Sequence, residues 1–222
     1  MSDTAVSLDA LFESHLATLS RRFASALERE GYGGALLYSG TLIYAFRDDA
    51  TYPFRAHAPF KQWAPVTDVP ECFVYFEPGR QPLLLFFSPT DYWYKPAVVP
   101  RSYWTRHFDI RPIRSRAEAR EALPADLGKV AYVGERFAEL EQWGVAAVNP
   151  EPLLTRLDYE RAIKTPYELE CLREANRIGV QGHLAAARAF RDGASEFDIH
   201  LAFLRGCGLR EQELPYNAIV AL

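Results

Sequence analysis

The chain has 222 residues, of which 49% are hydrophobic and 24% charged, and its net charge is −4. These values are typical of a globular protein long enough for one large domain, or for one complete domain and part of another. The acidic balance, without a stretch rich in Lys and Arg, argues against nucleic acid as a partner.

Three scattered cysteines indicate free thiols in a reducing compartment. The N-terminus lacks the basic and apolar regions of a secretory signal, and no segment approaches the roughly 20 apolar residues of a membrane span. We therefore expect a soluble, cytoplasmic protein with no membrane partner.

The first part of the chain alternates between helix and strand patterns. Apolar residues at three- and four-residue intervals predict a helix over 8–27, which Gly31 ends. Short apolar runs predict a strand at 34–38 and a hairpin formed by strands 72–76 and 83–87. Further along we expect a helix over 116–123, a strand over 129–133, a helix over 136–143 and a strand over 145–148. This alternation favours an α/β fold, with a mixed sheet flanked by helices.

The composition changes at 149–152, where two prolines occur in four residues. We place a domain boundary here, with an N-terminal domain over 1–152 and a second, helical domain over 153–222. In the second domain Thr165, Pro166 and Glu168 predict a capped helix start, and Ser195 predicts another.

The last residues, 216–222, are an apolar run that predicts a β-strand. An uncovered strand at this position would expose unpaired backbone groups and would favour aggregation. We therefore expect the chain to be part of a larger fold.

No catalytic constellation is evident in the sequence. The five histidines share no metal-ligand spacing, and neither a serine elbow nor a phosphate-binding glycine loop is present. We assign no catalytic residue and no metal ligand.

Two features remain as candidate sites. Asp48 and Asp49 lie in an aromatic loop, where they form either a solvated turn or a carboxylate pair that meets a cation such as a peptide amino terminus. Tyr216 follows Pro215 at the start of the terminal run, and either packs there or lines a site.

Several motifs carry a resemblance to a known family. One set resembles the entry helices of the creatinase/prolidase "pita-bread" metallohydrolases: Arg161, Lys164, Thr165, Glu168, Leu172, Arg173 and Ala175, followed by Gly193 and residues 195–199. A second set resembles bacterial Xaa-Pro dipeptidases and the related organophosphorus acid anhydrolases: residues 15–19, the Asp48-Asp49 loop with 52–54, residues 60–66 and 91–93, and the run from Pro215 to Leu222.

The resemblance implies an N-terminal creatinase/prolidase-type domain, followed by the first helices and first strand of an incomplete pita-bread domain. Full-length family members bind two divalent metal ions, commonly manganese, through residues beyond the stretch that resembles 215–222. We therefore expect this chain alone to bind no metal and to be inactive.

The resemblance also implies partners and site residues. The substrate of the full-length protein would be an Xaa-Pro dipeptide, the assembly a homodimer, and the substrate-binding residues in this chain Asp49 and Tyr216. Two alternatives stay open: a non-catalytic binding or dimerisation module of the same fold, and an organophosphorus acid anhydrolase.

Overall fold

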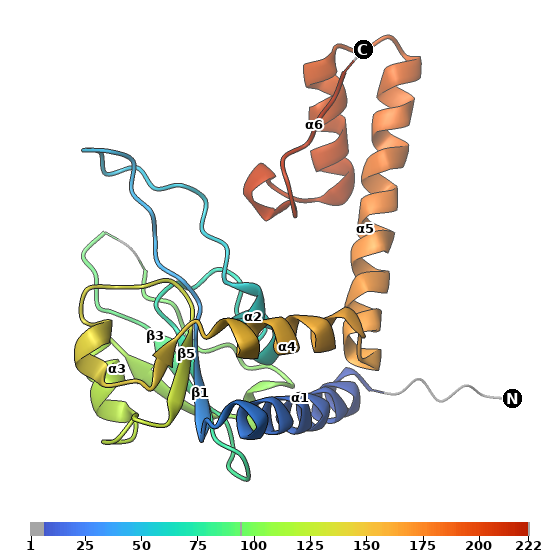
Figure 1. Cartoon of the computed structure of the whole chain (residues 1–222). Coiled ribbons are helices and arrows are strands. Elements are labelled where there is room, and N and C mark those ends of the chain that lie inside the picture. Colours follow the sequence, from blue (N-terminus) through green and yellow to red (C-terminus); the bar gives the residue numbers. More distant parts are fainter. Residues whose placement is uncertain (1–6, 94, 222) are drawn as a thin grey trace, which may run out of the picture. The chain divides into compact units, whose positions relative to one another are not determined.

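The structure is a computed structural model that describes residues 7–93 and 95–221. Its helices and strands (Figure 1) are, in chain order, α1 (Leu8–Glu30), β1 (Gly34–Tyr38), α2 (Ala58–Trp63), β2 (Phe73–Phe76), β3 (Leu83–Phe87), β4 (Asp109–Ile113), α3 (Arg116–Ala122), β5 (Val130–Val133), β6 (Ala147–Val148), α4 (Glu151–Ala162), α5 (Pro166–Arg191) and α6 (Glu196–Cys207). The described residues also form three short 3₁₀ helices, namely η1 (Thr105–His107), η2 (Leu140–Trp143) and η3 (Glu211–Glu213).

The chain divides into two compact units, one ending at Thr165 and the other beginning at Pro166. Helix α4 belongs to the first unit because it packs against α1, and Arg22 pairs with Glu160 at 3.2 Å across that contact. Thr165 is held in the first unit too, since its hydroxyl lies 2.8 Å from Nδ1 of the buried His15.

The division therefore falls later than the boundary expected at residue 152. Proline is well tolerated in the first turn of a helix, where its missing N–H has no intrahelical partner. Pro150 and Pro152 accordingly start α4, which lies within the first compact unit.

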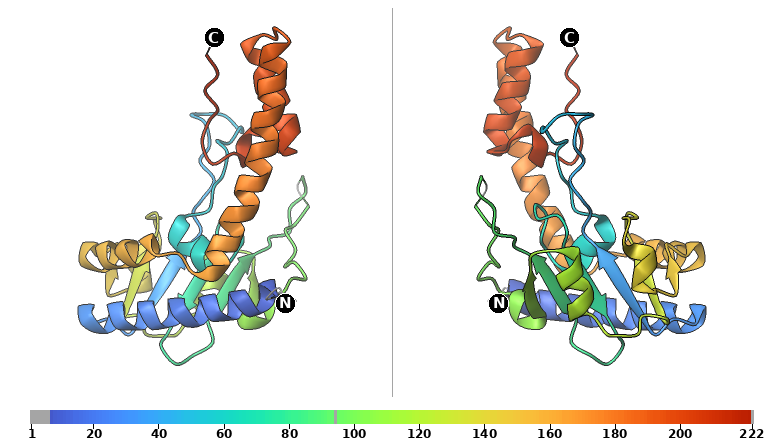
Figure 2. Two further views of the ribbon diagram at one scale, coloured as in Figure 1. Left: turned by 90° about the vertical axis from the view of Figure 1, so that its right-hand side faces the viewer. Right: turned by 90° about the vertical axis from the view of Figure 1, so that its left-hand side faces the viewer.

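The first unit contains the expected mixed sheet, with strand order β4-β3-β2-β1-β5-β6. The β2/β3 pair is antiparallel, as the predicted hairpin required, and β1/β2 is antiparallel too. The other pairs are parallel. Figure 2 shows α1 and α4 on one face of the sheet and α3 on the other.

Side chains of alternate residues along each strand fill these two layers. On the α3 side, Tyr38 stacks on Phe73 with ring centroids 4.7 Å apart. On the α1 side, Phe76 contacts the rings of Phe23 and Trp63. Every residue of β1 is buried, as expected for a central strand covered on both faces.

The helix predicted over 136–143 is wrong: only a short 3₁₀ turn, η2, forms at its end. Phe137 packs its ring against Trp143, with centroids 5.1 Å apart, and the Tyr132 hydroxyl donates a hydrogen bond to the Glu135 carbonyl oxygen. These contacts fix the chain after β5 in a non-helical conformation. The strand expected over 145–148 is also shorter, and comprises only β6.

Two elements were missed, α2 and β4. Helix α2 is a single six-residue segment, too short to show a clear apolar period. Strand β4 contains Pro112, which argues against a strand in the middle of a sheet. The sheet tolerates it because β4 is an edge strand that pairs only with β3.

The second unit is a pair of helices in close contact. Ser195 caps α6 as predicted, its hydroxyl accepting a hydrogen bond from the Asp198 N–H at 3.2 Å. At the crossing of the helices, a Cβ on Gly206 would lie 2.8 Å from the Ala185 Cβ, and a Cβ on Gly182 would lie 2.8 Å from the Phe203 ring. The two backbones approach this closely because both positions lack a side chain.

The strand predicted over 216–222 does not form in the described residues. Residues 217–221 lie next to α5 and α6 without a partner strand, and Leu222 lies outside the part described. Two leucines of α5 are substantially uncovered, with Leu169 41% and Leu172 46% exposed. None of the described helices is long and apolar enough to cross a bilayer.

We predict that Gly182→Ala weakens the helix pair by about 1–3 kcal/mol, because the added methyl overlaps Phe203 and Cys207 in a filled contact. Gly179→Ala is the matched control, since a Cβ there meets nothing within 4 Å and alanine favours the helix. Urea unfolding followed by circular dichroism measures both. Equal stability of the two variants would contradict the close helix crossing.

Candidate functional sites

The first candidate site is an arm, which we define as residues 41–54. Its two sides are joined by the Ala45 N–H to Ala50 carbonyl hydrogen bond at 2.9 Å and by the bridge between Tyr44 and Thr51. Figure 1 shows the arm extending from the end of β1, away from the sheet. Asp49 lies at the tip, in the turn between the two sides.

The two acidic residues of the arm have different surroundings. The Asp48 carboxylate accepts a hydrogen bond from the Ala50 N–H at 2.9 Å, and this bond holds the pKa of Asp48 below its ordinary value. Asp48 therefore has the geometry of a turn residue. Asp49 is exposed, and its substrate-binding role stays a prediction.

The arm also exposes large apolar side chains. Phe46 at the tip is 93% exposed, and the others are Ile43, Tyr44 and Tyr52. Apolar side chains gathered on one projecting segment mark an interaction surface more often than scattered single ones do.

A partly buried ion pair in the first unit was not found from the sequence. Arg116 on α3 donates two hydrogen bonds to the Glu71 carboxylate, both at 2.8 Å, and a third to the Tyr38 hydroxyl at 3.3 Å. Its guanidinium also lies 4.6 Å from the ring centre of Phe137. Because these residues are far apart in sequence, only the folded chain brings them together.

The protonation of this pair follows from its contacts. Burial acts to raise the pKa of Glu71, but hydrogen bonds from Arg116, Thr41 and Tyr38 outweigh it and the pKa is lowered. Burial raises the pKa of Tyr38. Glu71 and Arg116 are therefore both charged at neutral pH, and Tyr38 is neutral.

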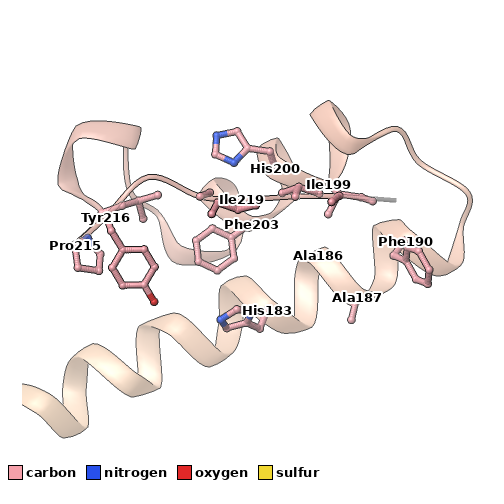
Figure 3. A pocket seen from close by; sticks show the side chains of 14 residues that line it. His183, Ala186, Ala187, Phe190, Ile199, His200, Phe203, Pro215, Tyr216 and Ile219 are labelled. Carbon is pink, nitrogen blue, oxygen red and sulfur yellow. The ribbon is translucent and has the colours of Figure 1, made fainter.

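The second candidate site is a cleft of about 540 Å³ in the second unit. It lies between α5, α6 and residues 214–221, and Figure 3 shows the Tyr216 and Phe203 rings in the space beside α5. Its walls are mostly apolar, with His183 and His200 among them. Nε2 of His200 lies 2.6 Å from Glu211, an ion pair when the imidazole is protonated.

The structure therefore places Tyr216 in a cleft of ligand-binding size. The residue is 77% exposed. Whether Tyr216 binds substrate stays a prediction.

The residues that the structure describes do not fit a metal centre. Within 7–93 and 95–221 there is no group of three or more His, Cys, Asp or Glu side chains placed to hold a metal ion. We assign no metal ligand to them.

Comparison with known proteins identifies the family. A sequence model of the N-terminal domain of Xaa-Pro dipeptidases matches residues 10–159. The chain belongs to this family.

It is 44% identical to an Xaa-Pro dipeptidase of Shewanella frigidimarina over 96% of this chain and 48% of that protein. It is 43% identical to one of Aeromonas hydrophila, over 97% of this chain and 49% of that protein. The chain thus spans about half the length of these relatives.

Solved structures support the fold. Escherichia coli aminopeptidase P in its low-pH form has a TM-score of 0.62 at 16% identity, over 92% of this chain and 50% of that one. A Zn-substituted form of the same enzyme in complex with product has a TM-score of 0.60 at 17% identity, over 85% of this chain and 48% of that one. At this identity the likeness shows the α/β fold alone.

We predict that Glu71→Gln lowers the free energy of unfolding by about 2 kcal/mol at pH 7, the range for a hydrogen bond to a charged group. Because the folded-state pKa of Glu71 lies below its ordinary value of 4.5, its charged form stabilises the fold above that pH. This contribution is lost as the pH falls below 4.5 through the folded-state pKa.

The difference between Glu71→Gln and the native chain should therefore shrink as the pH falls below 4.5. Denaturant unfolding at several pH values measures it. Glu141→Gln, at an exposed position of η2, is the control with the same charge change. A difference independent of pH would contradict the ionised pair.

Proposed function

We propose that the chain is the N-terminal part of a metal-dependent Xaa-Pro dipeptidase, which hydrolyses dipeptides with a C-terminal proline. The observation that carries this proposal is the similarity to proteins named Xaa-Pro dipeptidase, at 43–44% identity over almost the whole chain. Because the match covers 96–97% of this chain, it extends into both units.

In this proposal the chain supplies structure and substrate contacts, and the catalytic metals are held elsewhere. The two divalent ions, manganese by the resemblance, would be bound by residues beyond this chain. Asp49 and Tyr216 would contact the substrate. A carboxylate suits the amino terminus of a dipeptide, and an exposed aromatic ring in an apolar cleft suits its proline ring.

We further propose that the full-length protein is a cytoplasmic homodimer. The exposed apolar residues of the arm support this assembly, because a projecting segment with Phe46 at its tip is suited to insert into a second copy. Sedimentation equilibrium of the full-length protein tests the assembly, and a monomer at micromolar concentration would contradict it.

We predict that the purified 222-residue chain hydrolyses neither Leu-Pro nor Gly-Pro, with or without added manganese. The full-length protein encoded by the same gene should hydrolyse both in a metal-dependent reaction, since the metals generate the nucleophile in this class of hydrolase. Release of free proline measures the activity.

Each possible failure has a separate meaning. Metal-dependent turnover by the homogeneous 222-residue chain would contradict the placement of the metals outside it. A metal-loaded full-length protein that cleaves no Xaa-Pro dipeptide would contradict the dipeptidase, and would favour a binding module of the same fold.

A further inference from the structure

A small pocket lies where the chain leaves β1 and β5. These neighbouring strands are parallel, and after them the chain proceeds in opposite directions, from β1 to β2 on one side and from β5 to β6 on the other. In open α/β sheets, ligands bind in the crevice that such diverging connections leave at the carboxyl ends of the strands. Glycine is found there: Gly40 follows β1 and Gly134 follows β5, both with positive φ.

The pocket has a volume of about 160 Å³, and the residues that matter in its lining are Thr41, Tyr52, Phe54, Arg55, His57 and Glu135. At about 30 Å³ per water molecule this is room for roughly five waters, so the pocket suits only a small ligand. All of its walls belong to the first unit.

Glu135 provides a fixed negative charge in this pocket. One carboxylate oxygen accepts a hydrogen bond from the Thr41 N–H at 3.2 Å, and the other lies 3.3 Å from Nε2 of His57. An ionised carboxylate has about four acceptor positions, so these contacts leave capacity for a further donor. The Glu135 side chain is also 39% exposed, and a ligand can reach it.

Arg55, which also lines the pocket, carries the opposite charge, and two aromatic residues line it as well. The guanidinium of Arg55 is suited to bind a carboxylate through two hydrogen bonds. The rings of Tyr52 and Phe54 give the pocket an apolar wall. A ligand that matches all three features carries an ammonium group, a carboxylate and a small apolar part.

We propose that this pocket binds a small free α-amino acid in its zwitterionic form. The ammonium group donates to Glu135, the carboxylate accepts from Arg55, and the side chain contacts Tyr52 and Phe54. The site lies in the first unit and does not depend on the proposed dipeptidase activity, so either can fail without the other.

Nuclear magnetic resonance titration of the 222-residue chain tests the proposal, with L-alanine, ethylamine and propionate as probes. Alanine has both charged groups, whereas ethylamine lacks the carboxylate and propionate lacks the amine. We expect saturable, millimolar binding of alanine, with shifts of the amide signals of Gly40, Thr41 and His57. Ethylamine and propionate should each bind at least fivefold more weakly.

The variant Glu135→Gln keeps the shape of the side chain and should lower the affinity for alanine at least tenfold. Glu141→Gln, with the same charge change at an exposed position outside the pocket, should leave it unchanged. Should Glu135→Gln fail to fold, Arg55→Gln gives the same test from the carboxylate side. Absence of saturable alanine binding, or equal affinity for the three probes, would overturn the proposal.

Discussion

A pair of helices can bury only the faces that they turn toward each other, and this constraint governs the second unit. Helices α5 and α6 meet closely where Gly182 and Gly206 lack side chains, but Leu169 and Leu172 remain substantially exposed. Apolar surface of this kind usually marks a site of interaction. The exposed leucines therefore mark the second unit as a surface for interaction. The cleft that contains Tyr216 lies in the same unit.

The first unit covers its apolar faces with its own elements, because helices lie on both faces of its sheet. The parallel pairing of β1 with β5 then decides what lies at the end of these strands. A Cβ on Gly134 would come within 2.7 Å of the Tyr38 Cβ, so the two strand ends are close. This proximity brings Glu135 to Thr41, and the arm leaves from the same point. The pair of Glu71 with Arg116 connects this end of the sheet to α3. A single strand pairing thus positions the arm, the ion pair and the small pocket.

Much of the fold could be predicted from local sequence patterns. The helix that ends at Gly31 and the hairpin around residues 77–80 depend on apolar period and turn residues, which are visible without tertiary information. Strand β4 could not be predicted, because Pro112 is acceptable only at an edge and the strand order was unknown. For the sites, short sequence motifs indicated Asp49 and Tyr216 as candidate residues. It could not reveal the ion pair of Arg116, whose partner is 45 residues away and adjacent only after folding.

Hydrogen exchange of backbone amides in the 222-residue chain is the most direct test of the contrast between a self-sufficient first unit and an incompletely covered second one. The account predicts the slowest exchange in β1 and β5, where every residue is buried and hydrogen-bonded within the sheet. Amides of α5 and α6 should exchange considerably faster, since local opening there exposes little additional apolar surface. Uniformly slow exchange across 166–221 in a sample shown to be monomeric would contradict the account.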